Sequence, residues 1–237
     1  MSKKKSGTLA EYQTKDNFLW VNFNAPNVRN ALSLEQAREL ASKVDQQKPK
    51  GLLLSATGPV FCSGGQLKDY AAHPQNGVVV NREIAQILKT LYELPIPKCV
   101  VVDGGCFGGG VELTTVFDRV LATPRAQFAL WQRRIGLSFG WGGEERLSKR
   151  IGFAALKEWY ITTNLKSSYG AHRLGLVDEV VSSERGVRVA FQWLQASSSF
   201  SEWALAAFVD PQCNEEETFA KLWLNIDHKK ALAPYSP

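Results

Sequence analysis

One carboxylate stands out because of what precedes it in the chain. Glu112 follows VVVDGGCFGGGV, in which a β-branched apolar run leads into glycines at 104, 105 and 108–110. A strand, a glycine-rich turn and a helix start together present backbone N–H groups where negative charge is favoured. Such a turn can bind a phosphate or stabilise an oxyanion, and Glu112 could carry a proton there.

Two phosphate-binding motifs do not match this stretch. The dinucleotide fingerprint GxGxxG needs a glycine where Phe107 or Leu113 stands, depending on the glycine at which the motif begins. No Gly-Lys-Ser/Thr follows, as a P-loop requires. An oxyanion hole remains, in which N–H groups stabilise an enolate or a tetrahedral oxyanion.

A second glycine pair lies in FCSGGQL, at 61–67, after its own apolar strand pattern. Two parallel strands could therefore each bring one backbone N–H donor to the same point, and two donors make a hole. The structural alternative is that both segments are tight turns that need glycine for a positive φ.

The elements that must position these groups alternate along the chain. The patterns predict strands at 18–24, 51–57, 95–104 and 118–124. A capping-box spacing from Ser33 to Gln36 predicts the start of a helix over 33–44. Further helices are predicted at 81–94, 145–162 with an interruption at Gly152, 186–198, 201–210 and 215–232. The alternation indicates βα units around a mainly parallel sheet, so we predict an α/β fold.

Composition limits the class of protein. A chain of 237 residues with 44% hydrophobic side chains suits one domain, or one domain with an appendage. The four cysteines show no CxxC spacing, which favours free thiols in a reducing compartment. No apolar run approaches the ~20 residues of a membrane span, and the N-terminus lacks the apolar segment of a secretion signal. We therefore expect a soluble, cytoplasmic protein without membrane association.

The net charge of +5 is weak support for nucleic-acid binding. Basic and acidic residues are interspersed, and the pure basic run Lys3–Lys5 falls in residues 1–7, an expected disordered tail. A modest positive bias would equally attract a small phosphorylated ligand.

Several motifs, in order along the chain, resemble the crotonase, or enoyl-CoA hydratase/isomerase, superfamily. They cover most of residues 15–181 and comprise NAL (30–32), FCSGGQLK (61–68), GGCFGGGVELTTVFD (104–118), AQFAL (126–130), GWGGEERL (140–147) and AHRLGLVDEVV (171–181). The resemblance implies a crotonase-like spiral of ββα units, with an acyl-CoA-binding core at 8–181. It also implies a short C-terminal helical region at 182–237, for a lid or trimerisation, and a homotrimer or hexamer.

The same resemblance implies roles for particular residues. The thioester oxygen of an acyl-CoA would accept hydrogen bonds from the N–H groups of Gly65 and Gly109, and Glu112 would be the acid/base group. CoA is then part of the substrate, and no separate cofactor is expected. Further substrate or CoA contacts are implied for Lys68, near a CoA phosphate, and for Arg29, Ala31, Trp131, Phe139 and Trp141. The three aromatic residues flank the expected acyl pocket, with ordinary core packing as the alternative.

One position departs from the family pattern. Hydratases carry a second glutamate in a segment that resembles FAQPE, and the aligned residue here is Gln132, which cannot titrate. Hydration uses two groups around one water, so the loss of one carboxylate predicts a poor hydratase. Double-bond isomerisation needs one base, but isomerases of this family commonly place that base at the second position. Neighbouring Glu144 and Glu145 are expected on the outer surface of a helix start.

Three functions therefore stay open. Enoyl-CoA hydratase/isomerase chemistry with the single carboxylate Glu112 is the leading interpretation. A malonyl-type acyl-CoA decarboxylase, with Gln132 or Arg133 near the departing carboxylate, is the nearest alternative, and the tryptophan of GWGG resembles that branch. A non-catalytic acyl-CoA-binding or RNA-binding protein is the third. No metal site is expected, since His73, His172 and His228 have no ligand spacing, and no base is indicated for Cys62 or Cys106.

Overall fold

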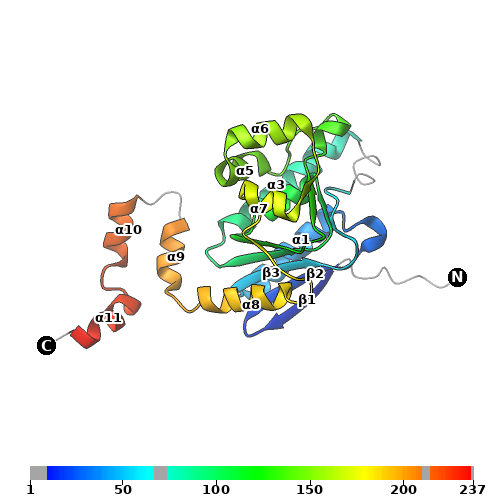
Figure 1. Ribbon diagram of the computed structural model, residues 1–237. Coiled ribbons are helices and arrows are strands. Elements are labelled where there is room, and N and C mark those ends of the chain that lie inside the picture. The colour runs from blue at the N-terminus through cyan, green and yellow to red at the C-terminus, as the bar shows by residue number, and fades with distance from the viewer. Residues whose placement is uncertain (1–9, 67–73, 210–213, 236–237) are drawn as a thin grey trace.

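The computed structural model describes residues 10–66, 74–209 and 214–235. Its strands form two sheets that lie beside each other (Figure 1). The larger has the order β1 (Ala10–Lys15), β2 (Phe18–Phe23), β3 (Gly51–Ala56), β5 (Lys98–Val102), β7 (Arg119–Ala122), β10 (Glu179–Val180). The smaller has the order β4 (Val60–Cys62), β6 (Gly105–Phe107), β8 (Gln127–Ala129), β9 (Lys166–Ser167). Neighbouring strands are parallel except for the antiparallel pairs β1–β2 and β8–β9.

Successive strands alternate between the two sheets. β3, β5 and β7 belong to the large sheet, and each is followed directly by a strand of the small sheet, namely β4, β6 and β8. The α-helices that follow are α3 (Gly77–Glu93), α4 (Gly109–Thr114) and α5 (Gly143–Ile151). This repeat is the ββα spiral, so the fold class predicted from the sequence is confirmed.

The remaining helices surround or extend this spiral (Figure 1). They are α1 (Leu34–Gln47), α6 (Phe153–Thr162), α7 (Ser168–Leu174), α8 (Gly186–Ser197), α9 (Glu202–Val209), α10 (Glu215–Leu222) and α11 (Ile226–Leu232), with short 3-10 helices η1 (Pro26–Val28), η2 (Pro74–Asn76), η3 (Gln132–Ile135) and η4 (Ala233–Tyr235). The helix predicted from Ser33 begins as expected, because the Ser33 hydroxyl accepts from the Gln36 N–H and the Gln36 side chain binds the Ser33 N–H.

The large sheet is covered on both faces, which explains its continuous apolar strands. In β3, Leu52 and Leu54 belong to the main core with α1 and α3, whereas Leu53 belongs to a second cluster with Ala190 and Leu194 of α8. Alternate side chains of a strand point to opposite faces, so a strand buried on both faces has no polar alternation. α8, which lies beyond the expected domain boundary at residue 181, therefore packs on the sheet.

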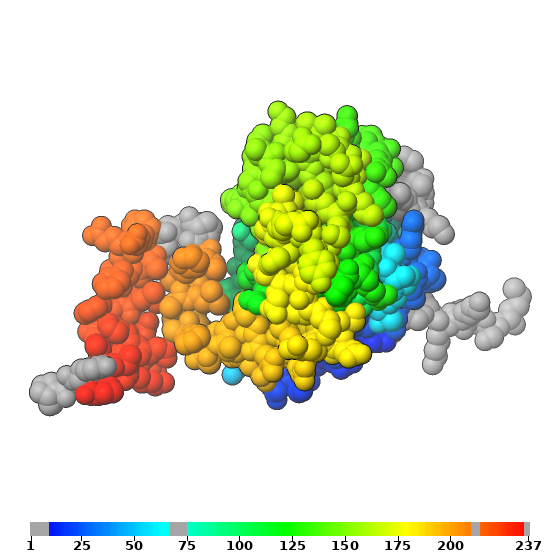
Figure 2. All heavy atoms as spheres, in the orientation of Figure 1, coloured from blue at the N-terminus to red at the C-terminus, as the bar shows by residue number. Residues whose placement is uncertain are grey.

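The helices after α8 stand away from the rest of the chain as a separate lobe (Figure 2). α9, α10 and α11 bury none of their residues and expose large apolar side chains, among them Trp203, Phe208, Phe219 and Trp223.

Two predicted helices are divided. Gly152, at φ 81°, separates α5 from α6, where the sequence predicted an interruption. The single helix predicted over 215–232 is wrong, because Leu224 has a φ of 58° and Asn225 caps a new helix with its side chain. The three-residue strands β4, β6 and β8 were not predicted, since so short a segment shows little periodicity.

Candidate active site

The two glycine-rich segments meet at the edge of the small sheet. β4 and β6 are paired, with Cys62 opposite Cys106, so the residues that follow them leave the sheet side by side. A Cβ on Gly64 would lie 3.2 Å from the Gly109 nitrogen, and one on Gly110 would overlap the carbonyl of Cys62. Glycine at these positions is thus required by backbone contact between the two loops, and Gly64 also has a φ of 100°.

Within the described part of the chain, the two N–H groups expected to form the oxyanion hole have no hydrogen-bond partner. Gly109 is the first residue of α4, and a first helical N–H has no acceptor within its helix. Among the described residues, no acceptor lies within hydrogen-bond distance of the N–H of Gly109 or of Gly65. Two N–H groups without a partner among the described residues, on loops in contact, are candidates for binding one oxyanion, and their catalytic role stays a prediction.

The NAL segment runs alongside the first glycine loop. Leu32 forms a bridge with Gly65, donates to the Gly64 carbonyl at 2.8 Å, and accepts from the Gln66 N–H at 3.1 Å. Ala31 is buried and Arg29 is exposed beside this segment, so both predicted CoA contacts lie next to the loop. Lys68, predicted near a CoA phosphate, lies outside the described residues.

Glu112 is buried and enclosed by hydrogen-bond donors. Its Oε2 accepts from the backbone N–H groups of Gly140 at 3.2 Å, Trp141 at 2.9 Å and Gly143 at 3.1 Å. Its Oε1 accepts from the Gln132 amide at 3.0 Å and, more weakly, from Gly140 at 3.4 Å. Because Gly143 is the first residue of α5, the positive end of α5 also faces the carboxylate. We call Glu112 with residues 140–143 the carboxylate cage.

The carboxylate cage depends on the absence of side chains. A Cβ on Gly143 would overlap the Cγ of Glu112, and a Cβ on Gly109 would lie 2.7 Å from the indole of Trp141. Trp141 thus contacts both the carboxylate and the second glycine loop, because its N–H binds Glu112 and its ring covers Gly109. Sequence patterns could not reveal these donors, since backbone N–H groups are common to all residues except proline.

Gln132 lies on η3 and is 7% exposed. Its Nε2 donates to Glu112, and its buried Oε1 has no partner among the described residues. The opposite amide orientation would direct an oxygen acceptor at the carboxylate, so this one is favoured. The free oxygen lies about 4.0 Å from a Cβ position at Gly108, beside the start of α4. Position 132 thus supplies one acceptor and no titratable group.

The three predicted pocket aromatics have different surroundings. Trp131 stacks on Phe107, with ring centroids 4.2 Å apart, and its buried Nε1 has no partner among the described residues. Phe139 packs on Tyr160 at 5.2 Å. The Trp141 ring is buried over Gly109. Trp131 and Trp141 therefore lie near the glycine loops, and Phe139 leads into residues 140–143.

Other candidate groups lie elsewhere or lack reactivity. Glu144 and Glu145 are exposed at the start of α5, as expected. His172 contacts the Val177 carbonyl, His228 accepts from the Leu224 N–H, and His73 lies outside the described residues. Burial raises the pKa of the Cys62 thiol to about 11 and raises that of Cys106 well above its ordinary value.

Sequence reasoning missed Arg146, a buried arginine beside the carboxylate cage. Its Nη2 donates to the Trp141 carbonyl at 2.7 Å, and its Nε donates to the Thr115 hydroxyl at 2.8 Å. The arginine of GWGGEERL was visible in the sequence, but nothing there distinguishes a buried guanidinium from an exposed one.

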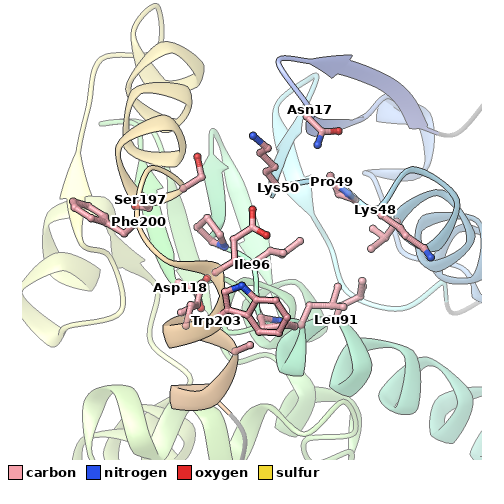
Figure 3. Close-up of a pocket in the computed structure, with 18 of the residues that line it drawn as sticks. Asn17, Lys48, Pro49, Lys50, Leu91, Ile96, Asp118, Ser197, Phe200 and Trp203 are labelled. Atoms are coloured by element: carbon pink, nitrogen blue, oxygen red, sulfur yellow. The ribbon is translucent and has the colours of Figure 1, made fainter. Parts of the chain in front are cut away.

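A large groove of about 1130 Å³ lies at a different place (Figure 3). α9 forms one wall, and the residues before β3, β5 and β7, including Lys50, Pro97 and Asp118, contribute to the lining. These residues stand at the amino ends of the parallel strands, whereas the glycine loops follow the carboxyl ends of β4 and β6. Gly65, Gly109, Glu112 and Gln132 do not line the groove, so it is separate from the candidate active site.

The described residues offer neither a metal-binding cluster nor a membrane-spanning helix. No cluster of three or more His, Cys, Asp or Glu side chains could hold a metal ion in this part of the chain. None of the described helices is both long and apolar enough to cross a membrane.

Comparisons with known proteins converge. A family model described as enoyl-CoA hydratase/isomerase matches residues 13–222. The ethylmalonyl-CoA decarboxylase of Rattus norvegicus is 30% identical over 224 residues, 90% of this chain and 75% of the relative. An enoyl-CoA isomerase/hydratase of Mycosarcoma maydis is 29% identical over 196 residues, 77% of this chain and 72% of the relative. The crystal structure of an enoyl-CoA hydratase from Bacillus anthracis superposes with a TM-score of 0.86 at 21% identity, covering 96% of both chains.

Proposed function

The chain belongs to the enoyl-CoA hydratase/isomerase family, and on that premise we propose that it stabilises the enolate of an acyl-CoA thioester at the N–H groups of Gly65 and Gly109, with Glu112 as the single acid/base group. It is an enzyme of this family with an acyl-CoA substrate. The observation that carries the proposal is the pair of free N–H groups on touching loops, with a buried carboxylate in the same helix as one of them.

The leading reaction is enoyl-CoA chemistry with one proton carrier. Glu112 takes a proton from a carbon next to the thioester carbonyl, and the C–H electron pair moves toward the thioester oxygen. The N–H groups of Gly65 and Gly109 stabilise the charge on that oxygen. When the enolate collapses, a proton returns to a carbon two positions away, which moves the double bond. One group suffices for this sequence, which fits a site with Gln132 at the second position.

Gln132 has a supporting role in this proposal. Its Nε2 holds Oε1 of Glu112, and its free Oε1 can accept a hydrogen bond from a water or from a substrate O–H. It can orient a water, but it cannot take the water's proton. Reversible hydration is therefore expected to be slow compared with a site that has two carboxylates.

The test is a mass-spectrometric assay with crotonyl-CoA, a 3-enoyl-CoA, methylmalonyl-CoA and ethylmalonyl-CoA. We expect Glu112→Gln to lower the turnover of an enoyl thioester by about 10²- to 10⁴-fold, the usual contribution of general acid/base catalysis. Glu145→Gln is the matched control, since Glu145 is an exposed acid at the start of α5. Unchanged turnover in Glu112→Gln contradicts the proposed role of Glu112.

Decarboxylation of a malonyl-type thioester is the second candidate. The bond between the α-carbon and the carboxylate breaks, CO₂ leaves, and the electron pair forms the same enolate, which then takes a proton at the α-carbon. A substrate carboxylate would be repelled by a bare Glu112, but the donors of the carboxylate cage and the Gln132 amide offset that charge. The similarity to the rat ethylmalonyl-CoA decarboxylase is consistent with this reading.

The Glu112→Gln variant separates the two reactions. Isomerisation needs the carboxylate as a base, so it is lost. Cleavage of the carbon–carbon bond needs no base, so CO₂ release from ethylmalonyl-CoA persists within about tenfold, since the oxyanion hole supplies most of the stabilisation. CO₂ release from the wild-type protein, without turnover of enoyl thioesters, would select the second candidate.

A further inference from the structure

Arg146 is a buried cation that has no ion-pair partner in the described part of the chain. Its side chain is 8% exposed, and no carboxylate oxygen in the described part of the chain lies within 4 Å of its guanidinium. Its face also contacts the ring of Tyr92, at 5.6 Å from the centroid. Burying a charge is costly unless other groups compensate it. The position therefore needs an explanation beyond ordinary packing.

The guanidinium binds oxygens that surround Glu112. Its Nη2 donates to the Trp141 carbonyl at 2.7 Å and weakly to the Glu112 carbonyl at 3.5 Å, and its Nε donates to the Thr115 hydroxyl at 2.8 Å. These acceptors belong to α4, to Thr115 directly after it and to the residues before α5. A planar guanidinium can hold several such oxygens in a fixed geometry, and an ammonium group cannot.

Trp141 lies between the two charges. Its N–H donates to Oε2 of Glu112 at 2.9 Å, and its carbonyl accepts from Arg146. Gly142, at φ 76°, leaves room for the guanidinium, because a Cβ there would lie 2.7 Å from Nη1. Burial lowers the pKa of Arg146, and the negative charge of Glu112 acts in the opposite direction. The anion on one side and the cation on the other thus fix the same residue.

We propose that Arg146 is a positioning residue that holds residues 140–143 in the conformation in which their N–H groups bind Glu112. The guanidinium fixes the carbonyl of Trp141, which aims its N–H at the carboxylate and keeps its ring over Gly109. Acid/base group and oxyanion donor are then aligned by one side chain that touches neither the substrate nor the carboxylate oxygens. The catalytic value of this contact rests on the proposed function, whereas the contact itself can be tested without turnover.

The first experiment is hydrogen–deuterium exchange of the peptide that contains residues 140–143, in the full-length protein. We expect exchange about tenfold faster in Arg146→Met, because the N–H groups of Gly140, Trp141 and Gly143 lose their fixed orientation. Arg146→Lys keeps the charge but loses the planar guanidinium with its several N–H donors. Exchange at residues 140–143 in this variant should be about threefold faster than in the wild type. Arg119→Met is the control, since Arg119 of β7 pairs with Glu179 of β10 and has no hydrogen bond to residues 140–143.

Exchange at 140–143 within twofold of the wild type in Arg146→Met, with the melting temperature unchanged, would overturn the proposal. If the methionine variant does not fold, Arg146→Lys decides in the same way, and unchanged exchange in that variant counts against the proposal. Thr115→Val is expected to give a smaller increase than Arg146→Met, because it removes one of the three acceptors and leaves the bond to Trp141.

A second experiment reads the consequence for catalysis, on any acyl-CoA that the wild type turns over. We expect kcat to fall about tenfold or more in Arg146→Met while KM changes less than twofold, with partial rescue in Arg146→Lys, because alignment is lost and binding is not. A fall in kcat/KM that comes entirely from KM contradicts the positioning role. If no acyl-CoA is turned over by the wild type, the proposed function fails and the exchange result still stands.

Discussion

Gly143 is the residue on which the carboxylate cage depends most directly. Its N–H binds Glu112, and its Cα touches the Glu112 side chain so closely that a Cβ would overlap Cγ. The backbone at Gly143 is not in the left-handed region, so the requirement for glycine comes from contact alone. Glu112 and the start of α5 are therefore packed against each other without space for a Cβ between them.

We expect Gly143→Ala to lower turnover by about 10²-fold, because even a displacement of about 1 Å of a reacting group has an effect of this size. Gly170→Ala is the control, since a Cβ there meets only ordinary contacts, the nearest at 3.5 Å from the Ser167 hydroxyl. The measurement is steady-state kinetics together with a thermal melt. Equal turnover in Gly143→Ala and Gly170→Ala would show that Glu112 moves without consequence.

The buried cysteines should be inert in the folded protein. Burial raises the pKa of Cys62 to about 11 and that of Cys99 to about 12, so at pH 8 only about one Cys62 thiol in 10³ is ionised. We expect native protein to resist iodoacetamide at Cys62, Cys99 and Cys106, and denatured protein to react at all three. Mass mapping after a short pulse measures this. Rapid labelling of Cys62 in the native state contradicts the stated burial.

The capping box of α1 directly follows the NAL segment along the chain. Ser33 directly follows Leu32, whose backbone pairs with Gly64 and Gln66, so the start of α1 and the first glycine loop share one short segment. Loss of the cap should therefore affect the stability of a segment beside the candidate site.

We expect Ser33→Ala to lower the free energy of unfolding by about 1 kcal/mol, the usual value for an N-cap. Ser167→Ala is a matched comparison, because Ser167 caps α7 by a single bond to the Gly170 N–H, without the reciprocal glutamine of the box. The loss there should be smaller. Urea denaturation at equilibrium measures both, and a larger loss for Ser167→Ala contradicts the advantage of the box.

The elements also show where sequence reasoning works. β3 was predictable because both of its faces are buried, which leaves a continuous apolar run. The break at Leu224 was not predictable, because nothing in the sequence marks a leucine that adopts a positive φ. The break at Gly152 was predictable, because glycine adopts a positive φ readily. Within the candidate site, Glu112 and the glycines were visible from their spacing. The backbone donors at 140–143 were not, since their direction is set by tertiary contacts with Glu112 and Arg146.

The segment from α9 to α11 exposes several large apolar side chains. Phe208 is 84% exposed, Trp203 64% and Trp223 54%, and they lie on the lobe that stands away from the core (Figure 2). Several large exposed apolar side chains on one lobe are typical of an interface between chains. We propose that this lobe is buried in a homotrimer.

We expect light scattering after size-exclusion chromatography to give three times the 26.3 kDa of one chain. Phe208→Glu should shift the distribution toward smaller species, because burying a charge in an apolar contact is unfavourable. Glu216→Lys, a change on an exposed polar residue of α10, is the control and should leave the mass unchanged. A wild-type mass of one chain at micromolar concentration contradicts the trimer.

The placement of Gln132 bears on how this protein could diverge. Trp141 binds Glu112 through its backbone N–H and packs its ring on Gly109. A change at any of these three residues therefore disturbs the other two. Gln132 contacts the same carboxylate from a separate short turn, η3, through a single side-chain bond. Under the proposed function, substitutions there can alter which proton donor or acceptor faces the substrate and leave the glycine loops in place. Evolution, or a laboratory selection, can therefore explore new reactions at one short turn without rebuilding the proposed oxyanion hole.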